Sequence, residues 1–99
     1  MSVITDEILA EAGRAAELHP GTEDLPDGTW DGGMRKHWRV IAQDACERAA
    51  RQGTLTFAHI LDEESCEALA QDDKVKLRAE LIQVAAICVR WIDKLDRGL

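Results

Sequence analysis

The chain has 99 residues, of which 45% are hydrophobic and only 4% aromatic, and its formal net charge is −7. This length corresponds to one domain, and abundant Ala and Leu with few aromatic residues favour helices over a β-sandwich. No hydrophobic run reaches the roughly 18 residues that a membrane span requires. The N-terminal sequence MSVITDEILAEAG lacks the basic segment of a secretory signal. We therefore expect a cytoplasmic protein with no membrane partner.

The negative charge is concentrated near the start of the chain. Residues 1–34 contain eight acidic residues and one basic residue, whereas residues 35–99 contain eleven of each. An acidic N-terminal third repels the phosphates of nucleic acids, so we expect no nucleic-acid partner. A free nucleotide that brings its own metal ions is compatible with this charge.

The first predicted helix begins at Thr5, which precedes two acidic residues, and extends to about Leu18. The next segment, HPGTEDLPDGTWDGG, contains four Gly, two Pro and four acidic residues. Its turn chemistry predicts a long loop, and we assign residues 19–34 to a flexible acidic loop rich in Gly and Pro. A loop this long in so small a domain is usually functional or disordered.

A second helix is predicted over residues 35–52 and ends at Gly53. It carries a narrow stripe of mostly small residues that favours close helix packing: Trp38, Ala42, Ala45 and Ala49.

A third helix follows a cap at Thr54 or Thr56 and extends to about Gln71. One of the two aspartates of QDD then caps a fourth helix that ends near Arg97. The connections are short, so neighbouring helices are expected to be antiparallel. The sequence thus predicts an all-α fold, a four-helix bundle that forms a single domain over residues 1–99.

Three cysteines, Cys46, Cys66 and Cys88, lie about twenty residues apart and form no CxxC pair or zinc spacing. Each falls within a predicted helix, where buried free thiols are expected.

Four glutamates form the main candidate site. Glu63, Glu64 and Glu67 lie within about 100° of one another on the third helix, at 100° per residue. Glu80 lies at the centre of the hydrophobic stripe of the fourth helix. A carboxylate on a buried face is costly unless it is paired, neutralised or bound to a cation. Three more acids nearby increase this cost because like charges repel, whereas Mg²⁺ removes it and also binds substrate phosphates.

Two simpler interpretations remain open. The cluster on the third helix is also what a solvated acidic face looks like, and Glu80 is also able to pair with Arg39, Arg48 or Lys74. Other metal sites are excluded by spacing, since the chain has no Glu-x-x-His pair of a di-iron bundle and no HExxH motif. It also has no Gly-rich phosphate loop and no serine nucleophile elbow.

The stretch EESCE, residues 63–67, resembles the EExxE signature of the MazG-like, all-α nucleoside triphosphate pyrophosphohydrolases. AELIQ follows about a dozen residues later, where that family has ExxD. The stretch from Gly53 to Asp93 resembles the compact MazG-like proteins of actinobacteria and their phages, and LPDGT, residues 25–29, is similar to a loop motif of that group.

The resemblance implies a helical homodimer or dimer of dimers with a nucleotide substrate. It implies Mg²⁺-dependent cleavage between the α and β phosphates, which yields a nucleoside monophosphate and pyrophosphate. By position, Glu64, Glu67 and Glu80 correspond to metal ligands, and Glu63 is the candidate for activating or positioning water. Gln83 stands where the family motif has Asp, so this ligand is an uncharged amide. That departure leaves a second interpretation open: a non-catalytic nucleotide-binding or helical protein-interaction module that has lost full metal binding.

Several residues are candidates for binding the substrate. Arg35, Lys36 and Arg39 at the start of the second helix, and Lys76 on the fourth, are candidate phosphate ligands with solvated surface positions as the alternative. Trp30 in the loop either stacks on the nucleobase or packs the loop against the helices.

The fourth helix is hydrophobic over an unusually wide arc. A single small subunit would hardly cover it, so a homodimer with this helix in the interface is predicted. The arc contains Leu81, Ile82, Val84, Ala85, Cys88, Val89 and Ile92.

Overall fold

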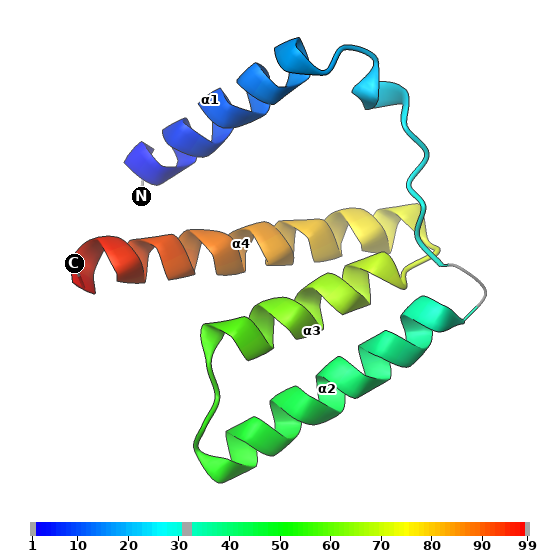
Figure 1. Cartoon of the computed structure of the whole chain (residues 1–99), viewed down its shortest axis with the longest axis vertical. Coiled ribbons are helices and arrows are strands. Elements are labelled where there is room, and N and C mark those ends of the chain that lie inside the picture. Colours follow the sequence, from blue (N-terminus) through cyan, green and yellow to red (C-terminus); the bar gives the residue numbers. More distant parts are fainter. Residues whose placement is uncertain (1, 31–32, 99) are drawn as a thin grey trace. The chain divides into compact units, whose positions relative to one another are not determined.

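A computed structural model describes residues 2–30 and 33–98 of the chain, and every α-helix in it lies close to its predicted position (Figure 1). The four α-helices of the described residues are α1 (Ser2–Leu18), α2 (Met34–Gln52), α3 (Phe57–Leu69) and α4 (Lys74–Gly98). A short 3₁₀ helix, η1 (Thr22–Asp24), interrupts the loop after α1. The described residues contain no strand. The prediction of an all-α fold with four helices is therefore confirmed.

The chain divides into two compact units. One comprises residues 1–27 and 89–99, and the other comprises residues 28–88. The second unit contains α2, α3 and the first part of α4, and it holds all the candidate site residues. The packing of four helices into one bundle and the single-domain organisation stay predictions.

The start of α1 differs from the prediction. The helix begins at Ser2 rather than after a cap at Thr5. Ile4, in the first turn, is only 5% exposed. Burial of an aliphatic side chain stabilises the turn that carries it, and a capping pattern does not report such burial.

Both ends of α2 are set by glycine. Gly33 precedes the helix with φ 115°, and Gly53 follows it with φ 72°, a left-handed conformation that costs glycine little. The backbone N–H of Gly53 donates to carbonyl oxygens of the last turn, as expected for a glycine that ends a helix. The predicted end of this helix is confirmed.

Side-chain caps define the starts of the next two helices. Thr56, not Thr54, caps α3, and it forms a reciprocal capping box with His59. Asp73 accepts a hydrogen bond from the backbone N–H of Lys76 at 2.9 Å, which identifies it as the cap of α4. The third helix ends at Leu69, so Gln71 lies in the connection rather than in the helix. Figure 1 shows the chain reversing direction between α2 and α3 and again between α3 and α4, as predicted.

Small residues bring α2 and α3 together. Ala42, Ala49 and Ala68 are at most 5% exposed, and α2 packs directly against α3. Trp38 was expected in the same packing stripe, but it is 50% exposed. Close contact between alanines leaves no room for an indole between the two backbones, so the ring lies at the edge of the interface.

The loop before α2 is attached to the end of α3. The backbone N–H of Trp30 donates to the carbonyl oxygen of Leu69 at 3.0 Å. Trp30 has a φ of 55°, which is uncommon for a residue with a side chain. Two residues of the predicted flexible loop, Asp31 and Gly32, lie outside the described residues. None of the helices in the described part is both long and hydrophobic enough to span a membrane.

Candidate metal centre

Three partly buried glutamates occupy one flank of α3 and share their electrostatic environment with Glu80 of α4. Burial raises the pKa of Glu64, and the charges of Glu63 and Glu80 raise it further. Burial is also the main cause of the raised pKa of Glu67, followed by the charges of Glu64, Glu63 and Glu80. The four carboxylates are thus close enough to repel one another, and a fully solvated acidic face does not describe them.

Glu80 is partly buried, and its two carboxylate oxygens have different surroundings. Oε1 accepts a hydrogen bond from the side-chain amide of Gln71 at 3.0 Å. Oε2 is buried and has no hydrogen-bond partner, and the same holds for Oε2 of Glu64. Buried carboxylate oxygens without donors are costly, and two of them on neighbouring helices are what a bound cation would compensate.

Two of the basic residues that the sequence offers as partners of Glu80, Arg48 and Arg39, lie near other acidic residues. Arg48 forms an ion pair with Asp44 on its own helix. Arg39 of α2 lies near Glu67, whose pKa its positive charge lowers against the raising effects. Nε of Arg39 is buried and makes no hydrogen bond, so this guanidinium retains a donor for an anionic ligand.

Glu63 has a partner on α2 that the sequence patterns did not indicate. The thiol of Cys46 donates a hydrogen bond to the Glu63 carboxylate, and this bond, with burial and nearby acids, raises the pKa of Cys46 to about 11. Cys46 is therefore a protonated donor at neutral pH. All three cysteines are free, as predicted. They are only partly buried, so the prediction that the thiols are buried is wrong. Closely packed alanines make the core too thin to enclose them.

The remaining candidates surround this cluster at varying exposure. Arg35 is partly buried, whereas Lys36 and Lys76 are exposed. Trp30 is 42% exposed, which leaves part of its indole accessible although its backbone anchors the loop. Gln83 is exposed on α4, and its side chain has no hydrogen-bond partner among the described residues.

The side chains of the cluster supply oxygen ligands of the kind that hard cations prefer, but they are not arranged around a common point. Carboxylate oxygens are the ligands that Mg²⁺ prefers. As the side chains stand, no three Asp, Glu, His or Cys residues of the described ranges are arranged to hold a metal ion. The two buried carboxylate oxygens that lack hydrogen-bond partners, on Glu64 and Glu80, are nevertheless suited to a cation.

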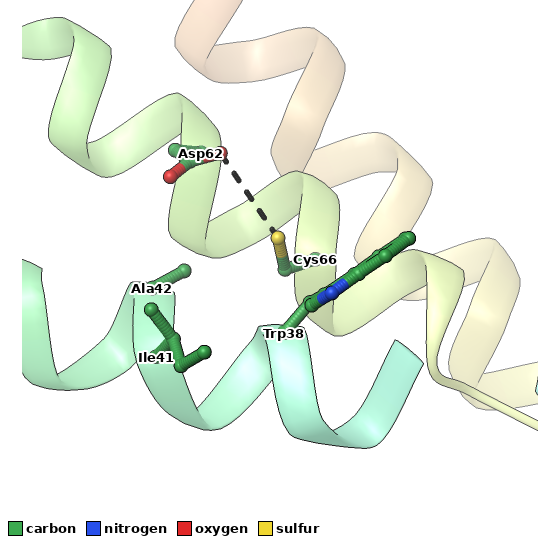
Figure 2. A pocket seen from close by; sticks show the side chains of 5 residues that line it. All are labelled: Trp38, Ile41, Ala42, Asp62 and Cys66. Carbon is green, nitrogen blue, oxygen red and sulfur yellow. Dashed lines mark hydrogen bonds between the residues drawn. The ribbon is translucent and has the colours of Figure 1, made fainter. Parts of the chain in front are cut away.

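A separate groove lies between α2 and α3, with a volume of about 300 Å³ (Figure 2). Asp62 and Cys66 line it from α3, and the thiol of Cys66 lies 4.0 Å from a carboxylate oxygen of Asp62. Asp62 is exposed and faces this groove. The residues that line the groove from α2 are Trp38, Ile41 and Ala42.

In comparisons with known proteins, no protein family model, no curated protein and no solved structure matches this chain.

Proposed function

We propose that this chain is a Mg²⁺-dependent nucleotide pyrophosphohydrolase that cleaves a nucleoside triphosphate, or a related nucleotide, to the monophosphate and pyrophosphate. The observation that carries the proposal is the mutual repulsion of Glu64, Glu67 and Glu80 across α3 and α4, with two buried carboxylate oxygens that lack partners. The resemblance of EESCE and AELIQ to the MazG-like motifs supports the same assignment.

The residues have complementary roles in this proposal. Glu64, Glu67 and Glu80, with the amide oxygen of Gln83, would hold Mg²⁺, which neutralises phosphate charge and polarises the reacting phosphoryl group. Glu63 orients a water molecule and accepts its proton as the water oxygen attacks the α phosphorus. The bond between that phosphorus and the bridging oxygen to the β phosphate breaks, and pyrophosphate leaves. Positioning and charge neutralisation supply most of the catalysis in phosphoryl transfer.

Basic and aromatic residues of the same unit provide the substrate contacts. Arg39 has the strongest claim among the candidate phosphate ligands because its charge already acts on Glu67 and its buried Nε lacks an acceptor. Arg35, Lys36 and Lys76 add positive charge around the acids, and the exposed part of the Trp30 indole offers a stacking surface for a base.

The second candidate function is a binding module without catalysis. Gln83 favours it, because an amide in place of the motif aspartate removes one negative charge from the metal site. An all-carboxylate site binds Mg²⁺ more strongly than a site with an amide. In this alternative the chain binds a nucleotide, or contacts another protein, and releases no product.

Incubation with a panel of nucleoside triphosphates and Mg²⁺, followed by detection of pyrophosphate, tests the proposal. Release of pyrophosphate that stops on addition of EDTA supports it. Release of orthophosphate alone indicates a different cleavage site. Nucleotide binding measured by calorimetry with no product in either assay favours the binding module.

A homodimer accompanies the proposed activity. Hydrophobic side chains on α4 are widely exposed, with Val75 82%, Leu81 52% and Ile82 54% accessible. A second copy of the chain would remove them from water. Light scattering at micromolar concentration is expected to give twice the mass of the 11.0 kDa chain, and Ile82→Lys is expected to shift the mass towards the monomer. A monomeric mass for the unmodified protein would contradict the prediction.

A further inference from the structure

Gln71 connects the end of α3 to the acidic cluster through both ends of its side-chain amide. It lies in the four-residue connection between α3 and α4 and is partly buried. Its Nε2 donates to Oε1 of Glu80 at 3.0 Å, nine residues along the chain. Its Oε1 accepts from the backbone N–H of Asp73 at 3.1 Å. One amide therefore links the connection, the start of α4 and Glu80.

The second contact fixes the orientation of the first. Asp73 is held on one side by Gln71 and on the other by the backbone N–H of Lys76, to which its carboxylate is bonded at 2.9 Å. A planar amide whose oxygen is fixed has little freedom to rotate its nitrogen away from Glu80. Glu80 therefore presents one oxygen to Gln71, which leaves the buried Oε2 as the oxygen available to another ligand.

The chemistry of the amide suits this task. A lysine or arginine in this position would neutralise Glu80 and compete with a bound cation, and another carboxylate would add to the repulsion. A neutral N–H donor orients the carboxylate and leaves its charge intact. Groups that hydrogen-bond to a metal-ligating carboxylate commonly alter metal affinity about 10- to 100-fold when they are removed.

We propose that Gln71 is a positioning residue that fixes the Glu80 carboxylate so that Oε2 faces the cation. The inference rests on the proposed function, because it assumes that Glu80 binds a metal ion. It adds a residue outside both sequence motifs and makes the connection between α3 and α4 part of the site.

The first test measures Mn²⁺ binding to the full chain by the loss of the free-ion electron paramagnetic resonance signal. Gln71→Met keeps the length of the side chain but removes both hydrogen bonds, and affinity is expected to fall about 10-fold. Gln43→Met is the matched control, since Gln43 is an exposed glutamine on α2 whose amide also contacts a glutamate, Glu47, at 3.5 Å. This control is expected to bind Mn²⁺ like the unmodified chain.

A double-variant cycle separates positioning from general loss of structure. In a Glu80→Gln background, Gln71→Met is expected to change the remaining Mn²⁺ affinity less than about 2-fold, because Gln71 acts through Glu80. An equal loss in both backgrounds would overturn the inference and indicate a structural role. Unchanged affinity of Gln71→Met in the unmodified background would overturn it too, while Mn²⁺ binding by the unmodified chain would leave the proposed metal site intact.

A measurement on the unmodified chain requires no variant to fold. In a Mg²⁺ titration followed by nuclear magnetic resonance, the side-chain amide signals of Gln71 are expected to shift along the same binding curve as backbone signals around Glu80. The amide signals of Gln43 are expected to stay constant. Constant Gln71 signals while the backbone reports binding would overturn the inference alone, and absence of any metal binding would overturn both it and the proposed function.

Discussion

The acidic residues of α1 and those of α3 and α4 have the same chemistry in different surroundings. Residues 1–34 carry seven net negative charges, yet the acids of α1 are exposed, and Glu11 pairs with Arg14 of the same helix. Residues 35–99 carry no net charge, yet this region holds the four glutamates that repel one another. Net charge therefore does not locate the candidate site, whereas partial burial without a partner does.

The two sets also differ in what they cost the folded state. An exposed ion pair such as Glu11 with Arg14 contributes between about 0 and 1 kcal/mol and is screened by salt. Partly buried carboxylates with raised pKa values favour the neutral form, so at neutral pH their charge opposes folding. A cluster of this kind is destabilising in the absence of a cation, and substitutions in the two regions are expected to have opposite consequences.

The largest expected difference in the rate of pyrophosphate release is between Glu80→Gln and Glu17→Gln. Glu17 is an exposed residue of α1. Glu80→Gln removes a proposed metal ligand, so pyrophosphate release is expected to fall at least about 100-fold, towards background. Glu17→Gln changes the net charge equally and is expected to leave the rate unchanged. Rates at saturating Mg²⁺, measured side by side, provide the comparison.

The melting temperature of Glu80→Gln tests the role of Glu80 independently of activity. Without metal, Glu80→Gln is expected to raise the melting temperature, because a charge is removed from the cluster while the amide oxygen still accepts from Gln71. A lower melting temperature together with full activity would show that Glu80 is a structural residue and not a ligand.

Most of the fold was predictable because helix limits depend on local chemistry. Gly53, Thr56 and Asp73 act within one or two turns of their own positions, so their roles follow from the sequence. The start of α1 at Ser2 was not predictable from the capping pattern, and its first turn carries the buried side chain of Ile4. The exposure of Trp38 depends on how closely the alanines of α2 and α3 approach, which periodicity does not specify.

The glutamates of the candidate site were predictable from the sequence, but the residues that hydrogen-bond to them were not. Helical periodicity places Glu63, Glu64 and Glu67 on one flank, and their mutual repulsion with Glu80 agrees with that arrangement. The contacts of Cys46 with Glu63 and of Gln71 with Glu80 were missed, because each joins residues from different elements. A residue type with many common roles, such as Gln in a turn, gives no signal in the sequence alone.

Gln83→Asp is expected to change activity less than Glu80→Gln does. The substitution adds a carboxylate three residues after Glu80, so the Mg²⁺ concentration for half-maximal activity is expected to fall several-fold. Because Gln83 is exposed and makes no hydrogen bond within the described residues, little stability is expected to be lost. Titration of Mg²⁺ against pyrophosphate release, with melting curves alongside, measures both effects.

The matched control is Gln43→Asp, which adds the same charge at an exposed position of α2. It is expected to leave the Mg²⁺ requirement unchanged. If Gln83→Asp also leaves it unchanged, Gln83 is not part of the metal site. If neither protein releases pyrophosphate but both bind nucleotide, the binding module is the better description.

The pH dependence of stability is expected to reveal the cluster without any activity. The pKa values of Glu64 and Glu67 are raised above 4.5 in the folded chain, so it keeps protons that the unfolded chain has lost. The free energy of unfolding due to these groups therefore falls as pH rises from 4.5 through the raised values. In EDTA, the melting temperature is expected to be higher near the lower end of this window than at neutral pH.

Two further measurements assign that dependence to the cluster. Glu64→Gln with Glu67→Gln is expected to flatten it, whereas Glu7→Gln with Glu17→Gln, two exposed positions of α1, is expected to leave its shape unchanged. Mg²⁺ is expected to raise the melting temperature more at neutral pH, where the carboxylates are ionised. Equal flattening by both double variants would mean that net charge alone produces the effect.

The smallest expected effect comes from the capping box at the start of α3, the helix that carries three of the glutamates. The backbone N–H of Thr56 donates to Nδ1 of His59 at 3.2 Å, and the N–H of His59 donates to the Thr56 hydroxyl at 3.2 Å. His59→Ala removes the first bond and keeps the second, so a loss of about 0.5 kcal/mol is expected, in the lower range for caps. Glu63 lies one turn beyond His59. If the cap positioned α3, fraying of its first turn would disturb the glutamates. If packing against α2 positioned it, fraying would not reach them. Packing of α2 against α3 is expected to hold the glutamates in place, so His59→Ala should lower the melting temperature slightly while Mn²⁺ affinity stays within about 2-fold. A proportionate loss of Mn²⁺ affinity would show that the acids of α3 depend on local helix stability, and the contrast with the acids of α1 would then reflect helix fraying as much as burial.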